Sequence, residues 1–350
     1  MRCLNAAVLL LLVAGTSGAE ELGARLTATA ASLRGALPED ARAVALFRFE
    51  DDEREDIRFA PLLLEGARHG DLHGEAASLT EQLLALSLSP RGLETARLIR
   101  RNERVVAKMD AARWVPGFVV ERMRDPGRYF IALFGEPSNA APWGFRYEGH
   151  HLSLNVTLAP GKLPATTPLF LGAEPRVVPA GEPDAGAAVL GEEEAAARAL
   201  LAALPAPQRA RATLPYQGDR GLMLGQVRRV TLAAGTGVSR GEMPPPAQAQ
   251  LDRLLAQFTD LFAPEIAGAR RAELDAAGRD ALRFAWAEAP ENPGSFYLRI
   301  QGPRTLIEID NTTDGDHLHA VWHDAEGDFG GDLLAAHYRR EHGIALQRQP

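Results

Sequence analysis

The stretch "LRFAWAEAPENPGSFYLRIQGPRTLIEIDNTTDGDHLHAVWHD", residues 282–324, decides the fold class. It contains four short runs rich in aromatic and β-branched residues, which are typical of strands. These runs are 282–289, 295–302, 305–311 and 317–324. Turn residues link them, namely Glu291-Asn292-Pro293-Gly294, Gly302-Pro303 and Asp314-Gly315. Short links of this kind join neighbouring antiparallel strands, so the stretch predicts a C-terminal β-meander.

The rest of the chain adds helices before and between strands. Residues 20–112 form a mostly helical lead-in, in which Ser89-Pro90 has the N-cap and first-position residues of a helix. Residues 113–350 carry the sheet, with inserted helices. Helices are expected at 191–204, 246–263 and 330–343, and further strands at 128–135, 143–159 and 167–172. Because strict βαβ alternation is missing, we predict an α+β fold with an antiparallel or mixed sheet, packed against helices from the N-terminal third and the middle.

The first nineteen residues have the order of a secretory signal. Arg2 supplies positive charge, residues 6–15 are apolar, and Ser17-Gly18-Ala19 offers a small-residue cleavage site. We therefore expect a signal peptide over 1–19 and a single mature domain over 20–350, secreted or periplasmic after cleavage near Ala19. The apolar run is too short to span a membrane, and no later run is long enough.

Composition narrows the classes of partner and site. The formal net charge of −8 argues against a nucleic-acid surface, which needs a basic stripe. The single cysteine, Cys3, would be lost with the signal peptide. A mature chain without thiols can bind a metal ion only through His, Asp or Glu.

Histidines gather in the last run of the meander. Alternation along "HLHAVWHD" places His317, His319 and His323 on one face and apolar residues on the other. An H-x-H strand holds two imidazoles about 7 Å apart, as many metal sites on sheets require. The preceding strand carries Glu308 and Asp310 on one face, where they could lie opposite the histidines.

A second histidine pair lies in "RYEGHHLSLN", residues 146–155. If this stretch is one strand, His150 and His151 point to opposite faces, and at most one can join a common site unless Gly149 marks a bulge. Spacing alone leaves two interpretations open. The histidines are hydrogen-bonding groups of a structural sheet, or they belong to a site for zinc or another first-row divalent metal.

Several blocks resemble the secreted, uncharacterised family called domain of unknown function 3500. They are "YFIALFGEPSNAAPWGFRYEGHHLSLNVTLA", "PLFLGAEPRVV", "YLRIQGPRTLIEIDN" and "HLHAVWHDAEGDFGGDLLAAHY". The resemblance implies an exported single-domain protein with no established activity. The matched blocks carry the candidate metal ligands His150, His151, His317 and His319 and the candidate binding residues Trp143, Arg146, Asn155, Trp322 and His337. His323 stands where the family usually has arginine, which removes it from the candidate ligands.

Two classes of function fit these residues. The first is a metal-dependent hydrolase, in which Glu148 or Asp324 acts as the base on a metal-bound water. The second is a non-catalytic protein of the cell envelope that uses the same histidines, with Trp143 and Trp322, to bind a metal or a small ligand. An open coordination position favours the enzyme and a closed shell favours the binder.

Overall fold

The computed structural model describes residues 4–60, 64–215, 227–232, 235–289, 294–311, 315–331 and 333. The helices are α1 (Leu4–Ala36), α2 (Glu39–Ala45), α3 (Gly74–Ser87), α4 (Pro90–Ala112), α5 (Gly117–Met123), α6 (Gly191–Ala203), α7 (Ala206–Ala212), α8 (Pro245–Thr259) and α9 (Pro264–Ala276). The strands are β1 (Leu46–Phe47), β2 (Ala67–Arg68), β3 (Phe130–Phe134), β4 (Trp143–Gly149), β5 (Leu152–Leu158), β6 (Leu169–Ala173), β7 (Val238–Ser239), β8 (Arg283–Glu288), β9 (Phe296–Gln301), β10 (Thr305–Asp310) and β11 (Leu318–Asp324). The helix expected over 330–343 lies outside the described residues except for positions 330, 331 and 333, and so does the candidate His337.

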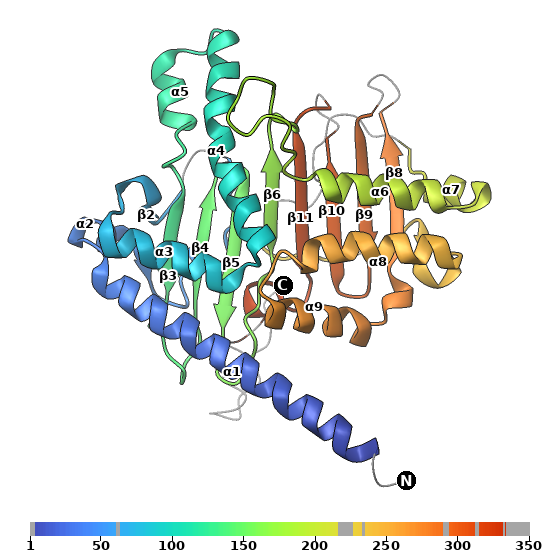
Figure 1. Cartoon of the computed structure of the whole chain (residues 1–350), viewed down its shortest axis with the longest axis horizontal. Coiled ribbons are helices and arrows are strands. Elements are labelled where there is room, and N and C mark those ends of the chain that lie inside the picture. The colour runs from blue at the N-terminus through green and yellow to red at the C-terminus, as the bar shows by residue number, and fades with distance from the viewer. Residues whose placement is uncertain are drawn as a thin grey trace.

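A single sheet joins the strands in the order β1-β3-β4-β5-β6-β11-β10-β9-β8-β7, with β2 also paired to β3. The pairs are antiparallel except β1 with β3, so the α+β prediction with an antiparallel or mixed sheet is confirmed. Strands β8 to β11 are consecutive neighbours and form the predicted meander. Strand β6 lies between β5 and β11, and it joins the two halves of the sheet (Figure 1).

The long helices α1, α3, α4, α6, α8 and α9 lie on one face of the sheet (Figure 1). Sequence features account for their ends and faces. The Ser89 hydroxyl caps α4 by accepting a hydrogen bond from the Gly92 amide at 3.1 Å, as predicted. Helix α8 buries the apolar stripe that includes Leu251, Leu255 and Phe258. Among the described residues, no helix is long and apolar enough to cross a membrane.

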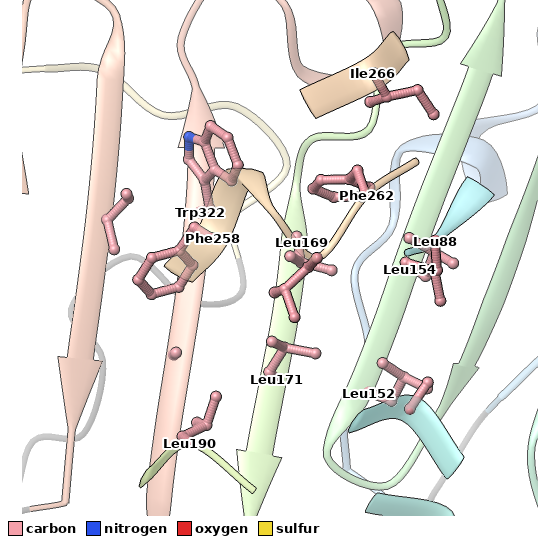
Figure 2. Close-up of a cluster of buried hydrophobic side chains, with 14 of the residues drawn as sticks. Leu88, Leu152, Leu154, Leu169, Leu171, Leu190, Phe258, Phe262, Ile266 and Trp322 are labelled. Carbon is pink, nitrogen blue, oxygen red and sulfur yellow. The ribbon is translucent and has the colours of Figure 1, made fainter. Parts of the chain in front are cut away.

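The hydrophobic core lies between these helices and the sheet (Figure 2). Trp322 of β11 packs there against Phe258 and Phe262, with ring centroids 6.4 and 6.3 Å apart. Trp143 of β4 is fully buried on the same face and donates a hydrogen bond to the Thr27 hydroxyl at 3.3 Å. Both tryptophans therefore contribute to the core, where they cannot contact a ligand at the surface.

The second face of the sheet is polar and yet buried. Its buried polar residues include Arg146, Glu148, Ser153, Asn155, Glu308, Asp310 and His323. Residues 51–59, which we call the covering segment, lie over part of it. The Arg146 guanidinium donates to the carbonyl oxygens of Glu53 and Asp56 at 2.6 and 2.9 Å. The Phe59 ring stacks on Phe170 at 3.7 Å. Alternation of apolar and polar residues is typical of a sheet with one solvent-exposed face, but here other parts of the chain pack over both faces of the sheet.

Candidate metal centre

His150 and His151 are the two turn residues of a hairpin. Strands β4 and β5 pair up to Gly149 and Leu152, which leaves only the two histidines to connect them. His151 has a φ of 65°, a left-handed conformation that type II turns place at their second central residue and that Gly or Asn usually occupies. The prediction that one strand carries the two rings on opposite faces is therefore wrong, because the chain reverses direction between them.

The hairpin places its histidines beside the H-x-H strand. Strand β6 pairs with both β5 and β11, so Gly172 of β6 lies opposite His319. Atom Nε2 of His151 lies 2.7 Å from Nε2 of His317. The ring of His319 is 5.2 Å from that of His151 and 4.4 Å from that of His317, and His150 stacks on His151 at 3.7 Å. We call these four residues the histidine cluster.

Gly172 lets the rings approach the sheet. A Cβ at this position would lie 2.7 Å from Cδ2 of His151 and 2.9 Å from Cδ2 of His319, closer than real contacts allow. The backbone also fixes the turn, since the His151 amide donates to the Phe59 carbonyl at 3.1 Å and its carbonyl accepts from the Gly172 amide at 2.7 Å. The two rings consequently lie over a glycine that leaves them room.

Charged side chains from other elements surround the cluster. The Glu103 carboxylate of α4 lies 2.6 Å from Nδ1 of His150, and its second oxygen has no hydrogen-bond partner among the described residues. The Arg124 guanidinium lies 3.0 Å from the same ring nitrogen and also bonds the Asp110 carboxylate at 2.7 Å. Glu174 approaches His317 at 3.8 Å. The cluster is thus enclosed by carboxylates and one cation.

Burial controls the protonation of the cluster. It lowers the pKa of His150 to about 3, an effect that the neighbouring Arg124 cation strengthens. Burial and the adjacent histidines hold the pKa of His151 well below its usual value. Burial also raises the pKa of Glu103 to about 8. At neutral pH both imidazoles are therefore neutral, which is the form that binds metal ions.

The donor atoms form two groups of three, which we call triads, and each triad could hold a metal ion. Within a triad, the donor atoms lie no more than 4.8 Å apart, and the two triads share one histidine. The first triad is His151, His317 and His319, and the second is Glu103, His150 and His151. Two imidazole nitrogens bound to one tetrahedral zinc ion are about 3.3 Å apart, from Zn–N bonds of about 2.0–2.1 Å. The first triad fits such an ion after small ring movements, and its His317 and His319 are partly exposed.

Neither predicted base lies in the cluster. The Glu148 carboxylate, on the second face, pairs with the Arg146 guanidinium at 3.0 Å, and burial raises its pKa to about 7. Asp324 lies five residues beyond His319 on β11, a separation of about 16 Å along an extended strand. It binds the Arg304 guanidinium through two hydrogen bonds of 2.8 and 2.6 Å. These contacts hold both carboxylates in ion pairs with arginines.

The candidate binding residues are also placed elsewhere. Trp143 and Trp322 lie in the core, and Arg146 is buried beneath the covering segment. Asn155 donates to the Pro168 carbonyl at 3.0 Å on the second face. His323, set aside as a ligand, is fully buried with Nδ1 2.5 Å from Asp328. The structure thus brings together the four histidines but leaves the other described candidates outside the cluster.

Sequence reasoning missed Glu103, although a signal for it exists. Helix α4 buries a stripe at positions 96, 99, 103, 106 and 110. Glu103 and Asp110 occupy this otherwise apolar stripe, and a charged residue in a buried stripe needs a polar partner. The two acids thereby point from the helix towards His150 and Arg124.

A family profile described as "Protein of unknown function (DUF3500)" matches residues 20–331. No curated protein and no solved structure matches the chain. Because the profile covers most of the sequence, including the hairpin and the H-x-H strand, the chain belongs to the DUF3500 family of proteins of unknown function.

Proposed function

We propose that the histidine cluster binds a first-row divalent metal ion, most suitably zinc, and that this centre supports metal-assisted hydrolysis in an exported protein. The observation that carries the proposal is the convergence of His151, His317 and His319 with their nitrogens no more than 4.8 Å apart. The β4–β5 turn supplies one of these histidines, and β11 with the residue before it supplies the other two. Three imidazoles with an open fourth position are a ligand set of catalytic zinc sites.

Glu103 is the residue best placed to handle protons. Its carboxylate belongs to a triad with His150 and His151, and one of its oxygens has no hydrogen-bond partner among the described residues. A bound zinc ion supplies Lewis acidity and lowers the pKa of water. Burial raises the pKa of Glu103 to about 8, and a cation bound nearby would favour the ionised carboxylate, which is the form that accepts a proton near neutral pH. Glu103 therefore replaces Glu148 and Asp324 in the proposed role of base.

A non-catalytic binding protein is the second candidate. The observation that favours it is the second triad, in which Glu103 and His150 share His151 with the first and offer further protein donors that could close a four-coordinate shell. A closed shell excludes water from the metal and is typical of structural sites. The two candidates share the same ion and differ in whether one coordination position stays open.

Metal analysis tests the shared part of the proposal. Untagged protein is incubated with zinc, desalted, and analysed by mass spectrometry of its metal content. We expect bound zinc in the wild type and its loss in His319→Ala. The matched control is His73→Ala. His73 is exposed and occupies the N-cap position of α3, but its side chain makes no capping hydrogen bond. The metal centre would be refuted if the wild type bound no zinc and if added zinc did not raise its melting temperature.

Substitution of the base separates the two candidates. Glu103→Gln keeps the shape of the side chain and removes its ability to accept a proton. Zinc-loaded wild type and variant are compared on chromogenic esters and phosphodiesters. We expect the wild type to turn over one of these classes, and Glu103→Gln to lose that activity by about 10²–10⁴-fold while keeping its zinc. Equal activity in both proteins would exclude Glu103 as base, and zinc binding without turnover of either class would favour the binding protein.

Export is the remaining part of the proposal. Its support is the charged, apolar and small-residue order of residues 2–19. Expression of the full chain in a bacterial host and N-terminal sequencing of the exported fraction should give a chain that begins at Glu20. Recovery of the intact N-terminus from the cytoplasm alone would contradict this part without affecting the metal centre.

A further inference from the structure

Helices α4 and α5 form a hairpin that projects beyond the sheet (Figure 1). Two large apolar side chains lie at its tip. Trp114 is 91% exposed and Phe118 is 75% exposed. Single exposed apolar residues are ordinary, but a pair of aromatic rings at the end of a projecting element is typical of a surface that meets another apolar phase.

The backbone at Trp114 supports a role beyond folding. Trp114 follows the last turn of α4 with a φ of 64°, and its amide donates to the Ala111 carbonyl at 3.1 Å. Glycine is the residue preferred at such a left-handed helix end. A tryptophan here is conformationally unfavourable and contributes almost no burial, so neither helix capping nor core packing accounts for it.

The charge around the tip is positive in an acidic protein. The exposed charged residues between positions 104 and 123 are four basic ones, Arg104, Lys108, Arg113 and Arg122, and one acidic one, Glu121. Because Lys108 and Arg113 pair with the carboxylates of Glu182 and Glu174, two of the four positive charges are offset, and Arg104 and Arg122 carry the positive charge of the hairpin, whereas the whole chain carries a net charge of −8. We call Arg104, Lys108, Arg113 and Arg122 the basic collar. Aromatic rings flanked by basic residues match the chemistry of an anionic lipid surface, where rings enter the headgroup layer and cations contact phosphates.

We propose that the α4–α5 hairpin docks on an anionic phospholipid bilayer, with Trp114 and Phe118 in the headgroup layer and the basic collar against lipid phosphates. Docking would hold the histidine cluster near the membrane surface. Glu103 precedes Trp114 by eleven residues, about 17 Å along a helix. The inference goes beyond the proposed metal chemistry, because it depends only on exposure and charge at the tip.

Tryptophan fluorescence of the full chain gives a local test. The other three tryptophans, Trp143, Trp286 and Trp322, are at most 3% exposed, so a change of environment at the tip is reported by Trp114. We expect vesicles of phosphatidylglycerol to shift the emission to shorter wavelength and vesicles of phosphatidylcholine to leave it unchanged. High salt should reverse the shift, since it screens the contacts between exposed charges and phosphates.

Variants identify the residues that bind. Phe118→Ala retains the fluorescent reporter and should weaken vesicle binding. Arg122→Ala should weaken it roughly fivefold, the effect expected for one basic residue at an anionic surface. Val44→Ala is the control, because it shortens an exposed apolar side chain on α2, outside the hairpin. Zinc binding should be unchanged in all three variants, which separates this test from that of the metal centre.

Three results would overturn the proposal. The first is an emission spectrum that neither kind of vesicle changes. The second is an equal shift with both lipids, which would remove the role of the basic collar. The third is a lipid-free dimer in sedimentation velocity that Phe118→Ala converts to monomer, because a second copy of the chain would then cover the tip.

Discussion

Substitution of Gly172 by alanine should impair the metal centre without removing a donor atom. The added methyl carbon would lie 2.7 Å from Cδ2 of His151 and 2.9 Å from Cδ2 of His319. Carbon atoms in contact are normally about 3.5–4.0 Å apart. The rings of His151 and His319 must therefore move by roughly 0.8 and 0.6 Å at least. His151 cannot swing away freely, because it is buried and stacked on His150.

The size of this effect follows from two opposing terms. Overpacking of a well-filled site costs about 1–3 kcal/mol. Replacement of glycine by alanine at an unstrained position gains about 0.4–1 kcal/mol through the unfolded state. The steric term prevails, so the metal-free variant should be less stable by about 0.5–2 kcal/mol. Zinc affinity should fall at least tenfold, because a ring movement of this size exceeds the roughly 0.2 Å tolerance of metal–ligand distances.

Two measurements check the prediction against a matched control. Calorimetric zinc titration gives the affinity and denaturant unfolding gives the stability. Gly268→Ala is the control, because a Cβ on this exposed residue of α9 meets no atom within 4 Å. It should leave zinc affinity unchanged and stabilise the helix slightly. If Gly172→Ala behaves like Gly268→Ala in both measurements, the rings do not lie over this glycine and the geometry of the cluster is wrong.

Three further predictions concern the surroundings of the cluster. Trp322→Ala should lower the free energy of unfolding by about 3–5 kcal/mol in denaturant titrations without changing zinc stoichiometry, because the ring lies in the core. Asp324→Asn should cost about 1–3 kcal/mol by the same assay and also retain zinc, because this carboxylate pairs with Arg304 at the far end of β11. Metal-free protein should lose stability as the pH falls from about 6.5 towards 3, because the unfolded chain then protonates His150 and His151, whose folded pKa values are lowered; Glu103, whose folded pKa is raised to about 8, opposes this loss until the pH falls below its ordinary carboxyl pKa. His150→Gln should flatten that slope in unfolding measurements across this pH range.

Local patterns were sufficient to predict much of the fold. The meander followed from turn residues between β-rich runs, and α4 began at Ser89-Pro90 as its capping residues indicated. The insertion of β6 between β5 and β11 could not be predicted, because pairing between distant strands leaves no local pattern. The same holds for the burial of the second face, which depends on packing of the covering segment against Phe170 and Val321.

The residues of the histidine cluster and their convergence were predicted, but the turn that carries His150 and His151 was missed. The H-x-H pattern and the adjacent histidines His150 and His151 predicted the four residues that converge. The turn was missed because His150-His151 lacks the Asn-Gly or Asp-Gly signal of a two-residue hairpin. The nearby carboxylates Glu148 and Asp324 were chosen by sequence distance, whereas Glu103 comes from a helix 47 residues before His150.

The cluster is costly for a fold that has no need of it. It buries neutral imidazoles and a carboxyl group of which one oxygen has no hydrogen-bond partner among the described residues, and it holds His151 in a left-handed conformation that side chains rarely adopt. An apolar layer, like the one on the opposite face, would stabilise the sheet more. A ligand that binds only the folded chain offsets such a cost, by about 4 kcal/mol when its concentration is a thousand times its dissociation constant. The neutral histidines and Glu103 form a donor set that could hold a divalent ion, and the proposed metal binding would account for both the chemistry of the cluster and its cost to the fold.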